Sequence, residues 1–161
     1  KLQRHFHIEL FPKTPDGRRR FLAAIEKPQH DQSTLGASFK DHPRYLLLGL
    51  RKSETLQQLT HDISPELRSL DVTTLHVLLM EHILGISTRD AVNTEAVAYT
   101  HDADEALAEV ETGSYQGAFV LKPPSASEMI AVSLTGEKMP QKSTYFFPKL
   151  VTGLVIHKVE V

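Results

Sequence analysis

A short segment in the last third of the chain holds the side chains best suited to chemistry. Its candidate anion-binding groups are two ammonium groups and three hydroxyls, on Lys142, Ser143, Thr144, Tyr145 and Lys149. An ammonium group neutralises phosphate charge and a hydroxyl donates a short hydrogen bond to it, so the segment predicts an anion site. A structural role also fits, in which the aromatic residues fill the core and the lysines are solvated.

The loop that precedes these side chains imitates a phosphate-binding P-loop only in part. Residues 136–143 read Gly-Glu-Lys-Met-Pro-Gln-Lys-Ser, and Gln141 stands where a P-loop needs its second glycine. Pro140 has no N–H to offer a phosphate, and the loop is expected to follow a helix rather than a strand. The pattern argues against a true P-loop and leaves a looser anion site.

The histidines do not form a recognisable metal-binding pattern. His5 and His7 would share a face of a strand, but no third ligand is identifiable in the sequence. His76, Glu81 and His82 do not match the spacing of a zinc protease. We therefore predict no metal site.

Two clusters of charge are better explained by helix starts than by chemistry. Three consecutive arginines at 18–20 would fan over about 200° of a helix, so they cannot converge on one ligand. Asp102, Asp104 and Glu105 suit the first turn of a helix, where carboxylates are favoured by capping and by the helix dipole. No catalytic residue is predicted from either cluster.

Composition indicates a globular protein and disfavours several partners. The 161 residues are 40% hydrophobic and 24% charged, and 18 basic against 20 acidic residues give a net charge of -2. Nucleic-acid domains usually carry a basic excess, so nucleic acid is an unlikely partner. No apolar run reaches the ~20 residues that span a bilayer, so no membrane partner is expected. The absence of cysteine agrees with a cytoplasmic location.

Hydrophobic periodicity predicts an α+β class, with a mixed sheet and helices packed mainly on one face. Strands are expected at residues 6–11, 34–39 and 45–51, and the continuously apolar third one should be central in the sheet. Helices are expected at residues 18–27, 53–61, from 65 and at 72–84. Asp71 should cap the last of these and Gly85 should end it, with a core stripe of Val72, Leu75, Leu79 and Ile83.

The last third predicts a β-α-β-α-loop-β pattern. Strands are expected at residues 96–99, 115–121 and 154–159. Two capping boxes, at residues 102–105 and 125–128, should open helices that end at Gly113 and Gly136. We predict a single domain over residues 1–161, with a weak subdivision near residues 53–70. Because the chain opens on Lys1 rather than Met, we expect it to be the C-terminal fragment of a longer protein.

The closing third also resembles the C-terminal region of a bacterial and archaeal family known only as domain of unknown function 1015. Residues 70–160 carry the resemblance, and residues 1–69 match only loosely. The most specific matching residues are Met139-Pro140, Lys142-Ser143-Thr144-Tyr145-Phe146, Pro148-Lys149 and Thr152-Gly153-Leu154-Val155-Ile156. Earlier matching residues include Leu70-Asp71-Val72, Leu75-His76, Leu84-Gly85-Ile86, Tyr99, Asp102, Glu105-Ala106, Gly113, Ala118-Phe119-Val120-Leu121 and Pro123.

The resemblance implies a partner domain that this chain lacks. Longer members of the family carry an N-terminal Asp-Gly-His-His-Arg type motif, similar to the ParB/sulfiredoxin fold of free-serine kinases. Residues 16–20 read Asp-Gly-Arg-Arg-Arg and lack both histidines. The resemblance thus implies a C-terminal domain that completes a phosphate or nucleotide site, for ATP, ADP or a small phosphorylated ligand, with the missing N-terminal domain. The alternative is a structural or interaction module without an active site of its own.

Overall fold

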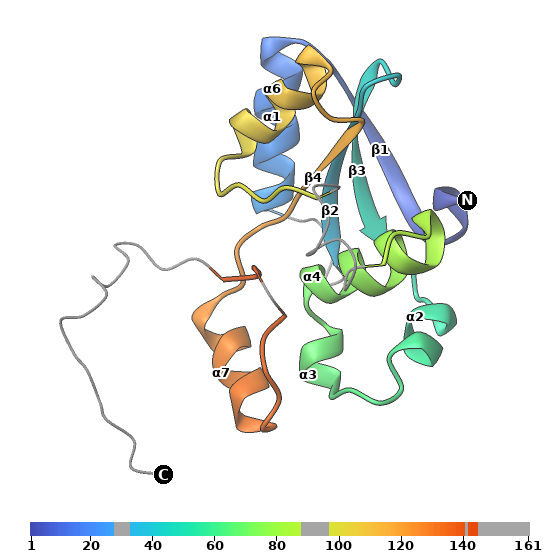
Figure 1. Ribbon diagram of the computed structural model, residues 1–161, viewed down its shortest axis with the longest axis vertical. Helices are drawn as coiled ribbons and strands as arrows, with labels where there is room; N and C mark the ends of the chain where they lie inside the picture. The colour runs from blue at the N-terminus through green and yellow to red at the C-terminus, as the bar shows by residue number, and fades with distance from the viewer. Residues whose placement is uncertain (28–32, 88–96, 141, 145–161) are drawn as a thin grey trace, which may run out of the picture.

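A four-stranded sheet forms the centre of the computed structural model, which describes residues 1–27, 33–87, 97–140 and 142–144 (Figure 1). The strand order is β1-β3-β2-β4, and the strands are β1 (Phe6–Pro12), β2 (Thr34–Phe39), β3 (Arg44–Leu50) and β4 (Gly117–Val120). β3 lies between β1 and β2, as its apolar run predicted. The predicted mixed sheet is corrected, because every described strand pair is antiparallel.

Helices fill most of the remaining described chain, and the α+β class is confirmed. In chain order they are η1 (Leu2–Arg4), α1 (Pro15–Glu26), α2 (Glu54–Leu59), α3 (Pro65–Arg68), α4 (Asp71–Thr73), η2 (Thr74–Leu84), α6 (Ala103–Thr112) and α7 (Ala126–Leu134). α1 begins earlier than predicted because Thr14 caps it by accepting a hydrogen bond from the Gly17 N–H, with Pro15 at the first position.

Helices cover both faces of the sheet, which corrects the prediction that they pack mainly on one face. β3 has consecutive apolar residues, so each of its faces carries a side chain that must leave water. Leu46 and Leu48 point to one face and pack in a cluster with η2, whereas Tyr45 and Leu47 point to the other, where α1 and α6 lie. Figure 1 shows α1 and α6 together on one side, and the green helical segment of α4 on the other.

The face beneath α1 and α6 is closely packed around an aromatic group. The Phe21 and Tyr45 rings stack at 4.9 Å, and the Tyr45 hydroxyl donates a 2.6 Å hydrogen bond to Glu111 of α6. Burial is the main cause that raises the pKa of Tyr45 to about 12, and the hydrogen bond to Glu111 adds to it. Gly36 of β2 lies directly below α1, where a Cβ atom would approach Phe21 Cζ to 2.7 Å. The absence of a side chain at this position lets the helix sit against the strand.

The opposite face is covered by a helix that differs from the predicted α-helix. Its range agrees with the prediction and it ends at Gly85, whose φ of 73° is left-handed. However, residues 74–84 form a π-helix, with hydrogen bonds to the fifth rather than the fourth residue. Two members of the predicted core stripe, Leu75 and Leu79, are buried, and Ile83 is partly buried against the same cluster. Thr74, Leu78 and Met80, which the stripe did not include, are buried as well.

The last third departs from its predicted pattern at one strand. Residues 97–99 are described and do not form a strand, and the strand predicted at 154–159 lies outside the described residues. The second capping box is present in full, with Ser125 and Glu128 bonding to each other's backbone N–H. The first is half formed: Asp102 caps α6, but the Glu105 carboxylate accepts from the Thr100 hydroxyl instead.

Substitution of Gly36 by Ala should lower the free energy of unfolding by about 1–3 kcal/mol, because overpacking forces α1 away from the sheet. Ser38→Ala is the matched control on the same strand and face. The buried Ser38 hydroxyl has no hydrogen-bond partner among the described residues, so its removal should leave stability unchanged or slightly raised. Urea denaturation measures both. Equal stability of the Gly36→Ala variant and the parent would show that α1 does not lie this close.

Substitution of Tyr45 by Phe should remove a pH-dependent contribution to stability. The folded protein keeps the Tyr45 proton up to a pKa of about 12, whereas the unfolded chain loses it near 10. The hydrogen bond thus contributes about 0.5–1.5 kcal/mol below pH 10, and this is lost as the pH rises toward 12. Denaturation at pH 8, 10 and 11 should show the advantage of the parent over Tyr45→Phe shrinking. A constant difference would contradict the assignment.

Candidate functional site

The predicted lysine segment lies partly within the described chain, after α7. Lys142 and Thr144 are exposed, and Ser143 is half-buried. The Ser143 hydroxyl donates a 2.6 Å hydrogen bond to the Pro140 carbonyl oxygen, which closes a tight turn. Lys142 lies in this turn with a φ of 59°, the left-handed region that a side chain rarely adopts. Tyr145 and Lys149 lie outside the described residues.

A carboxylate anchors the chain between α7 and this turn. Glu137 accepts hydrogen bonds from the Ser64 N–H at 3.1 and 3.2 Å through its two oxygens, and from the Thr135 hydroxyl at 3.1 Å. Hydrogen bonds at Ser64 are the main cause that lowers the pKa of Glu137 below its usual range. Ser64 is the N-cap of α3, and α3 and α7 lie side by side in Figure 1. The start of the lysine segment is therefore held against α3.

The charge at Lys142 is open to solvent. Within residues 1–27, 33–87, 97–140 and 142–144, no carboxylate forms an ion pair with it. A left-handed, non-glycine residue is strained, and such strain is found most often at binding and catalytic positions. Chemically, the turn can offer an anion one ammonium group together with the Thr144 hydroxyl. The structure does not bring further described groups together with them.

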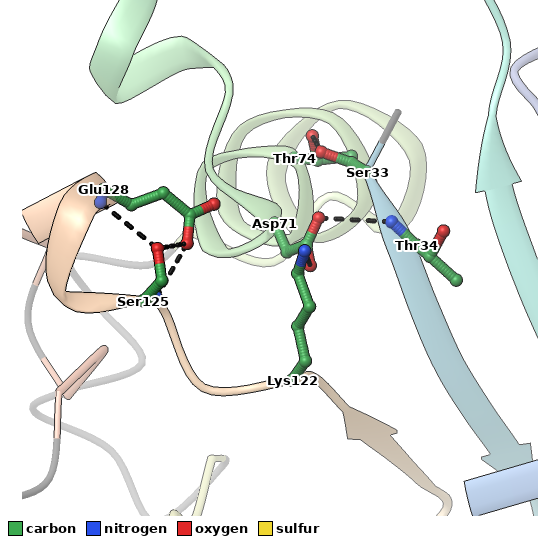
Figure 2. Close-up of polar contacts among 7 residues, drawn as sticks. All are labelled: Ser33, Thr34, Asp71, Thr74, Lys122, Ser125 and Glu128. Carbon is green, nitrogen blue, oxygen red and sulfur yellow. Dashed lines mark hydrogen bonds and ion pairs between the residues drawn. The ribbon is translucent and has the colours of Figure 1, made fainter. Parts of the chain in front are cut away.

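A second group of polar residues, which the sequence did not reveal, surrounds Asp71 (Figure 2). Asp71 was predicted to cap its own helix, but the N-cap position is Leu70 and carries no side-chain cap. Instead the Asp71 carboxylate, with only 8% of the side chain exposed, accepts a 3.1 Å hydrogen bond from the Thr34 N–H at the start of β2. The nearby Thr74 hydroxyl donates to Ser33 at 3.0 Å. Asp71 therefore joins the helix to the sheet.

Lys122 completes this group from the segment after β4. Its ammonium nitrogen lies 4.0 Å from Asp71 Oδ2, which is buried. Burial is the main cause that raises the pKa of Asp71; the Lys122 charge and the Thr34 hydrogen bond oppose it in part. Figure 2 also shows Glu128 beside this group, where its carboxylate is bound to Ser125 in the capping box of α7.

The geometry at Asp71 indicates a tether rather than a reaction centre. One carboxylate oxygen is bound by the Thr34 N–H, and the other faces Lys122, so neither is directed to an open cavity. An Asp–Lys pair could exchange a proton, but the described part of the chain offers no third group aligned with it. The sequence signal was weak, since Thr34, Asp71 and Lys122 are distant along the chain.

The other charged clusters serve the fold in separate places. Arg18 binds Asp104 of α6 at 3.2 Å, Arg19 binds Asp16 at 2.7 Å, and Arg20 lies over the Phe11 ring at 5.9 Å. The three arginines point to different partners, as their helical spacing predicted.

The described histidines and acids do not gather into a metal site. The rings of His5 and His82 meet edge to face at 6.0 Å. Among the residues that the structure describes, no group of three or more histidines and acids is placed to hold a metal ion. Over the same ranges, no helix has both the length and the apolar character needed to cross a bilayer.

Comparisons with models of known protein families, with curated proteins and with solved structures found no match for this chain. The resemblance of the last third to a known family accordingly stays a prediction. A function can therefore be proposed only from the geometry of the described residues.

Asp71→Asn tests the cost of the buried charge. The folded pKa of Asp71 is raised above 3.8, so the folded protein holds the proton more tightly than the unfolded chain. Stability from this group is greatest at low pH and falls as the pH rises through the folded pKa. The free energy of unfolding of the parent minus that of Asp71→Asn should therefore decrease as the pH rises above 3.8, where the unfolded carboxyl ionises while the folded one still holds its proton. A difference that grows with pH would contradict this assignment.

Asp71→Ala is the matched variant for the hydrogen bond. Unlike Asn, Ala offers no acceptor to the Thr34 N–H, so stability should fall by about 1–3 kcal/mol at every pH. Equal behaviour of the Asn and Ala variants would show that the contact with β2 contributes little.

Proposed function

We propose that this chain is a cytosolic binding module whose lysine segment contributes to a phosphate or nucleotide site. The observation that carries the proposal is the exposed Lys142 ammonium, which stands on a strained turn without a carboxylate partner among the described residues. A charged side chain held outward in this way is available to neutralise phosphate charge. Thr144, Tyr145 and Lys149 are the further donors of the site, whereas the Ser143 hydroxyl donates to the Pro140 carbonyl oxygen and holds the turn that carries Lys142.

The site is only partly formed within this chain, and a second domain encloses the ligand more fully. A binding site usually encloses its ligand with several convergent groups, whereas Lys142 and Thr144 face solvent. The resemblance of the last third to a longer family supports a missing N-terminal domain as the partner that completes it. In that assembly the ligand is ATP, ADP or a small phosphorylated molecule.

A structural or interaction module without its own active site is the second candidate. It is favoured by α7, on which Ile130 is 60% and Leu134 is 83% exposed. The two side chains are four residues apart and so share a helix face. An apolar face of this kind is typical of a surface that another protein covers.

Phosphate, ADP and ATP should raise the unfolding temperature of the chain through the lysine segment. A ligand present at 100-fold its dissociation constant adds about 2.7 kcal/mol to the free energy of unfolding. Lys142→Ala should abolish the shift, because it removes the ammonium group that faces the phosphate. Lys52→Ala, an exposed lysine between β3 and α2, is the control and should keep the shift. Thermal-shift titration measures all three.

The same titration with the longer protein separates the two candidates. If the ligands raise the unfolding temperature of the longer protein alone, and Lys142→Ala removes that rise, the two parts complete one site. The absence of a shift with phosphate, ADP and ATP in both forms would contradict the proposal and favour the interaction module.

A further inference from the structure

A groove of about 790 Å³ lies on the sheet face beside α1. Its described lining includes no residue of the lysine segment, and it shares Thr34 with the Asp71 group. Its floor is formed by neighbouring strands, on which His7 of β1 pairs with Gly49 of β3, and Glu9 pairs with Leu47. Gly49 has no side chain, so the floor is lowest at this position. The volume falls in the usual range for small-molecule sites.

One side of α1 forms the wall of the groove. Arg20, Ala23, Ala24 and the C-cap residue Lys27 line it. Each of the two adjacent alanines lies three or four residues from Arg20 and from Lys27, which places the four on one face of the helix. The core-facing side of α1 carries Phe21 instead, buried against the sheet. The two alanines are too small to close the space above the strands, so the groove stays open between them and the floor.

The charge around the groove is predominantly positive. Among the described lining residues, Arg20, Lys27 and Arg51 are exposed cations, and Glu9 is the one carboxylate. Within the described ranges none of the three cations forms an ion pair. The Arg20 guanidinium lies over the Phe11 ring, 5.9 Å from its centroid. Between the cations the lining is apolar, with half-buried Leu47 and the two alanines.

We propose that this groove binds a small amphipathic anion, with its apolar body over Leu47 and its anionic head between Lys27 and Arg51. Charge complementarity favours an anion over a cation or a neutral molecule, and the alanine wall admits a flat apolar body. None of the described residues that line the groove belongs to the lysine segment, so this site is proposed in addition to that one.

Two dyes that share an aromatic framework test the proposal on the 161-residue chain. 8-Anilinonaphthalene-1-sulfonate carries the anionic head, and N-phenyl-1-naphthylamine lacks it. Fluorescence titration should show saturable binding of the sulfonate at one site and weaker binding of the neutral dye. The double variant Lys27→Gln/Arg51→Gln should bind the sulfonate about tenfold more weakly, because each exposed ion pair changes the dissociation constant by about threefold. Its affinity for the neutral dye should be unchanged.

Two further variants locate the dye. Ala23→Leu fills the groove from an exposed helix position and should weaken both dyes, whereas Lys52→Gln, adjacent to Arg51 but outside the groove, should change neither. Circular dichroism checks that each variant is folded like the parent. The proposal is overturned by a parent that does not bind the sulfonate, by equal binding of the two dyes, or by unchanged binding in Ala23→Leu.

Discussion

The described fold depends on the burial of both faces of the β2–β3 hairpin. Leu46 and Leu48 must be covered from one side, and Tyr45 and Leu47 from the other, so the sheet cannot be stable with helices on a single face. The α4–η2 helix and the α1–α6 pair meet these two requirements. Other close contacts follow from the same constraint, including the approach of α1 to Gly36 and the bond from Tyr45 to Glu111.

The coverage of the second face is unequal along its length, and this inequality creates the groove. Phe21 and Ile25 of α1 fill the face near Tyr45, and Ala24 packs against them, whereas the exposed Ala23 lines the groove together with His7 and Gly49. A larger residue on that side of α1 would close the space. A structural helix and an open binding groove thus arise from two sides of one helix, which differ in side-chain size rather than in backbone.

Much of the fold could be predicted because its signals are local. The apolar run of β3 indicated a central strand, and Gly85, Gly113 and the Ser125 capping box marked helix ends correctly. The π-helix was missed because apolar spacing does not reveal whether backbone hydrogen bonds reach the fourth or the fifth residue. Helices on both faces followed from the β3 run itself, once the alternation of its side chains is considered.

The candidate sites were less predictable because their members are distant in sequence. The lysine segment was found as a local motif, yet nothing local indicates which other body completes it. Asp71 was predicted to cap its own helix because an acid at a helix start usually does so. Its carboxylate oxygen instead accepts a hydrogen bond from the N–H of Thr34, the first residue of β2. The groove combines α1 with β1 and β3, and no short pattern records that combination.

The distribution of charge over the fold reconciles a net charge of -2 with the two proposed anion sites. Several carboxylates already accept hydrogen bonds within the fold: Asp71 from Thr34, Glu111 from Tyr45 and Glu137 from Ser64. Arg51 and Lys142, in contrast, have no carboxylate partner among the described residues. In solution at 0.1 M salt, exposed charges act over about 10 Å, so a ligand responds to its nearest groups and not to the total. A net charge of -2 is therefore compatible with the two anion sites proposed above.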